Sequence, residues 1–155
     1  MILISHRGNI DGPNPAEENH PDYIQKALNL GFDVEVDVWY ENRKWWLGHD
    51  EPQYKTTLLW LRKKTNKLWI HAKNIEAAYQ LYAAPDFKHK HYFFHDTDDI
   101  TLTSKNFLWT YPGKRPLTPG SIAVMPEHTD WTKEELKSCA GICSDYIRKF
   151  EVSNG

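Results

Sequence analysis

Two carboxylates stand two residues apart in the hydrophobic segment VEVDVWY, residues 34–40: Glu35 and Asp37. Side chains at positions i and i+2 of a β-strand share one face, so these carboxylates would lie roughly 7 Å apart while the neighbouring valines face the other way. Two like charges side by side are unfavourable unless a positive group compensates them. Carboxylate oxygens are the ligands that Mg²⁺ and Ca²⁺ prefer, so a bound divalent cation would account for the pair.

Histidine and basic residues follow other hydrophobic runs of the chain. His6 and Arg7 come after the first run, His49 after the run KWWLG, and Lys73 after the run LWIHA. Imidazole can take up or give a proton near neutral pH, so histidines at such positions are candidates for general acid/base catalysis. Arg7 can hold phosphate through its planar set of donors, and Lys73 adds a point charge.

These residues must be positioned by a series of short secondary-structure elements. The runs that we predict as strands are 2–5, 32–38, 44–48, 68–72, 92–95, 107–111, 121–125 and 140–144. Uninterrupted apolar runs of this kind are typical of parallel strands that are buried on both faces. Helical spacing appears in residues 17–31, 58–64, 74–84 and 132–138, the last with Thr132 and Glu135 in the positions of a capping box.

The alternation of strands and helices predicts an α/β fold with a parallel sheet, and eight strands suggest a closed barrel. We predict a compact (β/α)₈ TIM-like barrel with several short or missing helices, as one domain over residues 1–155. The chain is much shorter than the ~250 residues of a regular barrel, so loops should replace helices, most plausibly after 92–95 and 107–111. An open doubly wound sheet fits the length better. The barrel better explains why the polar residues cluster at the carboxyl ends of the strands, where barrel enzymes build their sites.

Composition narrows the remaining possibilities. A net charge of -2 gives no electrostatic case for nucleic acid as the main partner. Every apolar run is shorter than the ~20 residues that span a membrane, so no transmembrane segment is expected. The start of the chain has neither a basic leader nor a small-residue cleavage site, and we expect a cytoplasmic location. Cys139 and Cys143 have neither a redox nor a zinc spacing, and we interpret them as reduced thiols in or near a buried strand.

Four motifs in order resemble the glycerophosphodiester phosphodiesterase family, within the wider group of phospholipase-like barrels that use paired histidines. They are His6-Arg7-Gly8, Glu18-Asn19, Glu35-Val36-Asp37-Val38 and His49-Asp50. Later in the chain, Lys73 in HAKN resembles the lysine after the family's fourth strand, and GICSDY at 141–146 resembles its last strand.

The resemblance implies a metal-dependent hydrolase for a glycerophosphodiester or a sugar-phosphodiester. It implies that His6 and His49 are the acid/base pair, with the choice of acid and base left open. It further implies that Glu35 and Asp37 bind one divalent cation, Mg²⁺ or Ca²⁺, with Glu18 near that metal. Arg7 and Lys73 would hold the phosphate.

The chain departs from the family in two places. His71 stands where the family usually has a third acidic ligand, and imidazole suits Mn²⁺ or Zn²⁺ better than Mg²⁺ or Ca²⁺. A different metal such as Mn²⁺, another carboxylate such as Glu127, a water molecule or a loss of catalysis are the open alternatives. The family's insertion after His49-Asp50 is missing, so we expect a more open pocket. The predicted partners are then a small-molecule or glycan-borne phosphodiester and, to complete the rim, a second copy in a homo-oligomer.

Two other functions remain open. A lyase resembling sphingomyelinase D would stop at a cyclic phosphate, and a non-catalytic module would bind phosphorylated sugars or lipid head groups without turnover. Among the other polar residues, Glu127 and Asp145 are interpreted as structural. Tyr111 or Trp109 at the rim could stack on a sugar.

Overall fold

The computed structural model describes residues 1–64 and 66–151 and contains one 10-stranded sheet. Its strands are β1 Ile2–His6, β2 Asp33–Glu41, β3 Lys44–Leu47, β4 Tyr54–Thr56, β5 Leu68–Ala72, β6 His91–Phe94, β7 Ile100–Leu102, β8 Leu108–Thr110, β9 Ser121–Val124 and β10 Gly141–Ser144. Its α-helices are α1 Pro21–Asn29, α2 Leu58–Lys63, α3 Ile75–Ala83 and α4 Lys133–Ser138, and the 3₁₀ turns are η1 Pro85–Phe87, η2 Pro126–His128 and η3 Ile147–Phe150.

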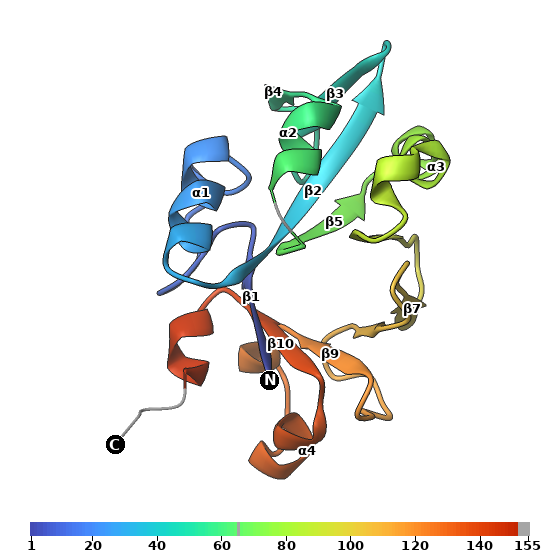
Figure 1. Cartoon of the computed structure of the whole chain (residues 1–155). Coiled ribbons are helices and arrows are strands. Elements are labelled where there is room, and N and C mark those ends of the chain that lie inside the picture. Colours follow the sequence, from blue (N-terminus) through green and yellow to red (C-terminus); the bar gives the residue numbers. More distant parts are fainter. Residues whose placement is uncertain (65, 152–155) are drawn as a thin grey trace.

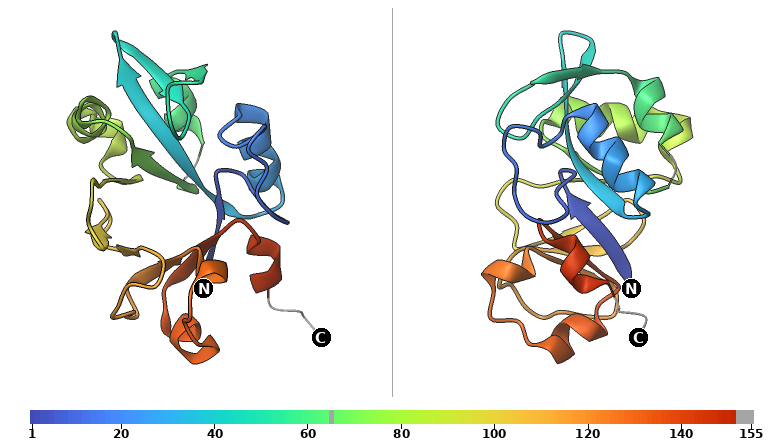
Figure 2. Two further views of the ribbon diagram at one scale, coloured as in Figure 1. Left: turned by 180° about the vertical axis from the view of Figure 1, so that it is seen from behind. Right: turned by 90° about the vertical axis from the view of Figure 1, so that its left-hand side faces the viewer.

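The sheet is mixed and curls into a half-barrel, with the helices on its outer side (Figure 1). From β6 the order runs β6-β5-β2-β1-β10-β9-β8, and each of these ladders is parallel. β7 is added antiparallel to β8, while β3 pairs antiparallel with the far half of β2 and β4 with β3. Figure 2 shows the same curl from two further sides. Its two margins, β6 and β7, are not joined by a ladder among the described residues.

The predicted (β/α)₈ barrel is therefore wrong. Segment 44–48 was expected to be a barrel strand, but it returns antiparallel along β2, because Asn42 and Arg43 form a tight turn with φ angles of 49° and 62°. A parallel neighbour needs a crossover of about a dozen residues or more, and two residues cannot provide one. Segment 107–111 also closes a hairpin, with β7, and the described chain has no α-helix between Phe94 and Ser121. As expected, loops replace helices after 92–95 and 107–111. In the described part of the chain β6 and β7 do not pair, so the sheet is not closed into a barrel.

Several local predictions are confirmed. Each predicted strand overlaps an observed strand, and each predicted helical segment contains a helix. α4 begins with the expected capping box, in which Thr132 accepts from the Glu135 N–H and the Glu135 side chain accepts from the Thr132 N–H. Cys139 and Cys143 are free and buried, the latter within β10. Among the described residues, no helix combines the length and the apolar character that crossing a membrane requires.

The two faces of the sheet have different roles. Val34, Val36 and Val38 of β2 belong to the outer core, with buried residues of α1 and α3. A second, inner cluster fills the concave side and consists of Ile4, Trp69, Phe93, Trp109, Ile122, Val124 and Cys143. Because side chains alternate along a strand, Glu35 and Asp37 face this inner side, next to the carboxyl ends of the strands. The apolar outer face thus holds in place a strand whose inner face is charged.

Candidate active site

The inward-facing side chains at the carboxyl ends of the strands line a cavity of about 250 Å³. Its walls are His6, Arg7, Glu35, Asp37, His49, His71, Lys73, His95, Trp109, Tyr111 and Val124. Glu18, which was also predicted, lines an adjoining cavity of about 240 Å³ that shares Arg7 and His49 with the first. The structure therefore brings all the predicted site residues to one region.

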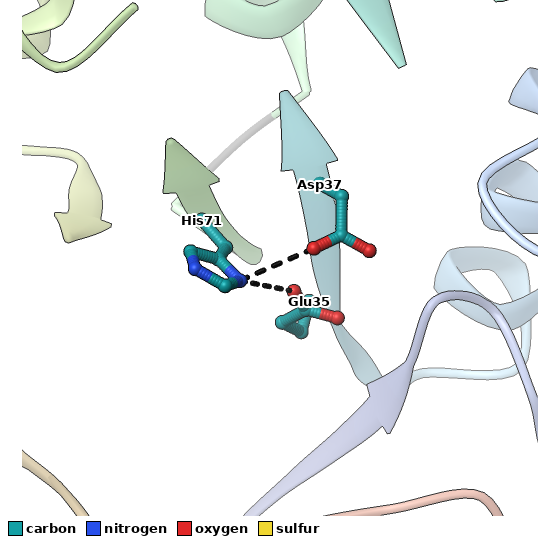
Figure 3. Close-up of side chains that lie close together, drawn as sticks. All are labelled: Glu35, Asp37 and His71. Carbon is teal, nitrogen blue, oxygen red and sulfur yellow. Dashed lines mark ion pairs between the residues drawn. The ribbon is translucent and has the colours of Figure 1, made fainter. Parts of the chain in front are cut away.

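Glu35 and Asp37 project from β2 toward His71 on the neighbouring strand β5, as Figure 3 shows. His71 Nδ1 lies 3.1 Å from Asp37 Oδ1 and 3.7 Å from Glu35 Oε1. Both carboxylates are at most 2 % exposed, and among the described residues Asp37 Oδ1 and Glu35 Oε2 have no hydrogen-bond partner. Glu35, Asp37 and His71 each offer a ligand atom within 4.8 Å of the others, so they can hold a metal ion.

Positive groups stabilise the charge of Asp37. Burial alone would raise the pKa of Asp37, but His71, Arg7 and Lys73 outweigh burial and hold that pKa well below its usual range. Arg7 Nε lies 3.1 Å from Asp37 Oδ2, and Lys73 Nζ lies 3.8 Å from Oδ1. Arg7 also donates from Nη1 to Glu18 Oε2 at 3.1 Å. Asp37 is therefore a carboxylate throughout the neutral pH range.

Asn19 fixes the orientation of Asp37. It is buried and has a left-handed backbone with φ 64°, a conformation that asparagine tolerates better than most residues. Its side chain donates to Asp37 Oδ2 and accepts from the Asp37 N–H, both at 2.9 Å. Sequence reasoning placed Asn19 in a motif but gave it no role.

His6, at the end of β1, is oriented by Asp145, which follows β10. His6 Nδ1 and Asp145 Oδ1 are 2.7 Å apart, and His6 Nε2 lies 3.9 Å from Glu35 Oε2. Burial would lower the pKa of His6, but the hydrogen bond to Asp145 and the charge of Glu35 raise it overall. With Nδ1 held by the carboxylate, Nε2 is the nitrogen that faces the carboxylate pair.

Asp145 is itself held on two sides. Asn9 donates to Asp145 Oδ1 at 2.8 Å and to Glu18 Oε1 at 2.9 Å, and the Asp145 N–H donates to Glu127 Oε1 at 2.9 Å. Asp145 was interpreted as structural, but its position against His6 makes it part of the site. The parallel ladder that pairs Ser5 with Ser144 brings it there.

His49 lies at the mouth of the site, on the loop that follows β3. Its side chain is 40 % exposed, and its Nδ1 lies 2.7 Å from Asp50 Oδ1. The loop is held by Trp39, whose Nε1 donates to the Gly48 carbonyl at 2.7 Å. Gly48 has φ 150°, and a Cβ atom there would stand 2.1 Å from the Glu51 carbonyl oxygen. The hairpin that contradicts the barrel prediction is thus the element that brings His49 to the cavity.

No protein-family model, curated protein or solved structure matches this chain. The resemblance of the motifs to the glycerophosphodiester phosphodiesterase family therefore stays a prediction.

Aromatic rings, including His95, Tyr111 and Trp109, form another part of the cavity wall. The His95 and Tyr111 rings lie 4.2 Å apart between centroids, and His95 also stacks on His71 at 4.7 Å. Burial, then the charges of His71 and Lys73, lowers the pKa of His95 to about 4, so its ring is neutral at neutral pH. Among the described residues, the buried Tyr111 hydroxyl and His95 Nδ1 have no hydrogen-bond partner. This wall offers uncharged polar groups to a ligand.

Proposed function

We propose that this chain is a metal-dependent phosphodiesterase that cleaves a glycerophosphodiester or sugar-phosphodiester by acid/base catalysis with His6 and His49. One observation carries the proposal: the two predicted acid/base histidines, a buried carboxylate pair and two cationic side chains line one cavity of about 250 Å³. General acid/base groups, a cation site and phosphate-binding charges are the parts that phosphodiester cleavage needs. The ordered motifs that resemble the glycerophosphodiester phosphodiesterase family support the same conclusion.

Glu35 and Asp37, with His71 beside them, would hold one divalent cation. The fit rests on two buried carboxylate oxygens without a hydrogen-bond partner in the described part of the chain and on three side chains that each offer a ligand atom within 4.8 Å of the others. When bound, the cation supplies a Lewis acid that stabilises negative charge on a phosphoryl oxygen.

The chain's own residues divide the remaining work. Asp145 fixes the ring of His6, so that Nε2 is the atom that takes up or gives the proton at the phosphodiester. His49, at the mouth of the cavity, carries out the complementary transfer, with its ring oriented by Asp50. Arg7 and Lys73 bind the phosphate anion from the side of Asp37.

Phosphorus NMR tests the proposal directly. The purified chain is incubated with a panel of glycero- and sugar-phosphodiesters and with Mg²⁺, Ca²⁺ or Mn²⁺, beside an EDTA control. The variants are His49→Ala and, as a matched control, His89→Ala, which removes an exposed histidine that lines neither cavity.

We expect a monoester to appear only with metal, to be lost in His49→Ala and to persist in His89→Ala. A cyclic phosphate as the final product would replace the hydrolase by a cyclising lyase. Diesters that bind with metal but are recovered intact would refute the enzyme and leave a binding module.

A further inference from the structure

We propose that this site prefers a divalent transition-metal ion that binds nitrogen ligands well, such as Mn²⁺, over Mg²⁺ and Ca²⁺, and that His71 sets this preference as a direct ligand. The inference rests on the metal site of the proposed function, but it is independent of the reaction catalysed there.

The His71 nitrogen lies at a distance from the carboxylates that is close to the spacing of metal ligands. Two ligands bound to one ion at about 2.1 Å stand about 3.0 Å apart at a right angle and about 3.4 Å apart at a tetrahedral angle. His71 Nδ1 lies 3.1 Å from Asp37 Oδ1 and 3.7 Å from Glu35 Oε1. The nitrogen is therefore at the spacing of a shared ligand from Asp37 and about 0.3 Å beyond it from Glu35, so a small movement of the Glu35 side chain lets all three bind one ion.

Two buried carboxylate oxygens of the site have no partner in good hydrogen-bond geometry among the described residues. Although His71 Nδ1 is 3.1 Å from Asp37 Oδ1, that oxygen lacks a hydrogen-bond partner among the described residues, and so does Glu35 Oε2. Buried polar atoms are nearly always paired, and leaving one unpaired costs about 1–3 kcal/mol. Asp37 Oδ1 lies beside His71, and Glu35 Oε2 lies 3.9 Å from His6 Nε2, so each carboxylate has an oxygen available to a ligand.

The packing around His71 keeps its imidazole ring turned toward the two carboxylates. His71 is 9 % exposed and stacks on Phe93 with centroids 4.9 Å apart and on His95 with centroids 4.7 Å apart, both nearly parallel. Its strand pairs it with Asp37 in the β2–β5 ladder, and Figure 3 shows its nitrogen pointing between the two carboxylates. A ligand held this rigidly contributes to metal choice as well as to affinity.

The cation site offers fewer oxygen ligands than Mg²⁺ or Ca²⁺ prefers. Ca²⁺ takes about six to eight oxygens, and Mg²⁺ strongly prefers oxygen over nitrogen. The neighbouring carboxylates are already engaged, since Glu18 accepts from Arg7 and Asn9, and Asp145 pairs with His6. In the described part of the chain, the cation site thus offers two carboxylates and one imidazole, a donor set that suits Mn²⁺ or Zn²⁺.

Metal binding to the EDTA-treated protein, without substrate, tests the inference. Free Mn²⁺ is followed by electron paramagnetic resonance, with Mg²⁺ and Ca²⁺ as competitors, for wild type, His71→Asp and His95→Phe. His71→Asp replaces the nitrogen by oxygen ligands. The control His95→Phe keeps the ring stacked on His71 and removes a nitrogen that we do not assign to the metal.

We expect His71→Asp to lower the preference for Mn²⁺ over Mg²⁺ by about tenfold or more and His95→Phe to change it less than threefold. An unchanged preference in His71→Asp, or an equal change in both variants, would overturn the inference. Pulsed electron paramagnetic resonance of bound Mn²⁺ adds a test that needs no folded variant, because a coordinated imidazole nitrogen gives a characteristic modulation in wild type. Its absence would show that His71 is not a ligand. Failure of diester cleavage would alter neither readout, so the two proposals fail separately.

Discussion

Asn19→Ala tests how the buried carboxylate of Asp37 is held in place. The substitution removes the donor to Asp37 Oδ2 and the acceptor of the Asp37 N–H, both of which are 2.9 Å contacts inside the protein. It also places alanine at φ 64°, where asparagine is tolerated and a plain Cβ residue is strained.

The structure gives the size of the effect. A buried N–H without a partner costs about 1–3 kcal/mol, and the lost hydrogen bond to a carboxylate is worth about 1.5–3 kcal/mol. Alanine in the left-handed region adds about 1 kcal/mol. Allowing for partial relaxation, we expect Asn19→Ala to lower the free energy of unfolding by about 3–5 kcal/mol.

Asn106→Ala is the matched control. Asn106 has nearly the same backbone, with φ 65°, but it is exposed and its side chain makes no hydrogen bond within the described residues. Its replacement should therefore cost only the backbone strain of about 1 kcal/mol. Equilibrium urea unfolding of the metal-free protein measures both variants. A difference between them below about 1 kcal/mol would refute the role assigned to Asn19.

Three further predictions follow from single contacts. Asp145→Asn should lower the turnover rate of diester cleavage by about 100-fold or more in steady-state assays, because it removes the charge that orients His6; activity within threefold of wild type would contradict this. Gly48→Ala should destabilise the protein by about 1–3 kcal/mol in urea, because its Cβ would meet the Glu51 carbonyl oxygen; an unchanged midpoint would argue against that clash. His91 stacks on Trp69, and burial, then Lys105, lowers its pKa to about 4. Since the unfolded chain binds a proton near pH 6.5 that folded His91 does not, stability is lost as pH falls from about 6.5 to 4. His91→Phe should lose about 1–2 kcal/mol less than wild type over this range in urea titrations, and parallel curves would rule this out.

The positions of strands and helices could be predicted because they depend on local patterns. Apolar runs mark the strands, and the Thr132 capping box marks the start of α4. The direction of a strand depends on the connection that precedes it, and the predicted parallel direction of segment 44–48 is wrong. The five residues between predicted strands 32–38 and 44–48 are too few for a parallel crossover, so a hairpin was the better prediction.

The site could be predicted as far as its residues follow strand ends. His6, Glu35 and Lys73 meet because parallel strands carry their carboxyl ends to the same edge. The role of Asp145 could not be read from the chain, because it lies 139 residues from His6 and reaches it only through the pairing of the first and last strands. The role of Asn19 could not be predicted either, because it depends on a positive φ angle and on two hydrogen bonds to Asp37 in a strand further along the chain.

The charges of the cavity link metal binding to phosphate binding. Arg7 Nε lies 3.1 Å from Asp37 Oδ2, and Lys73 Nζ lies 3.8 Å from Asp37 Oδ1. In the metal-free protein the Asp37 carboxylate therefore partly neutralises both positive charges and weakens their attraction for an anion. A divalent cation held by Glu35 and Asp37 would neutralise that pair and leave both side chains to attract phosphate. Because each binding event would neutralise a charge that opposes the other, a cation and a phosphodiester would strengthen each other's binding by the same free energy. If the proposed function is right, the carboxylate pair in β2 and the basic residues around it act as one electrostatic unit, and changing either part should alter the affinity of both ligands.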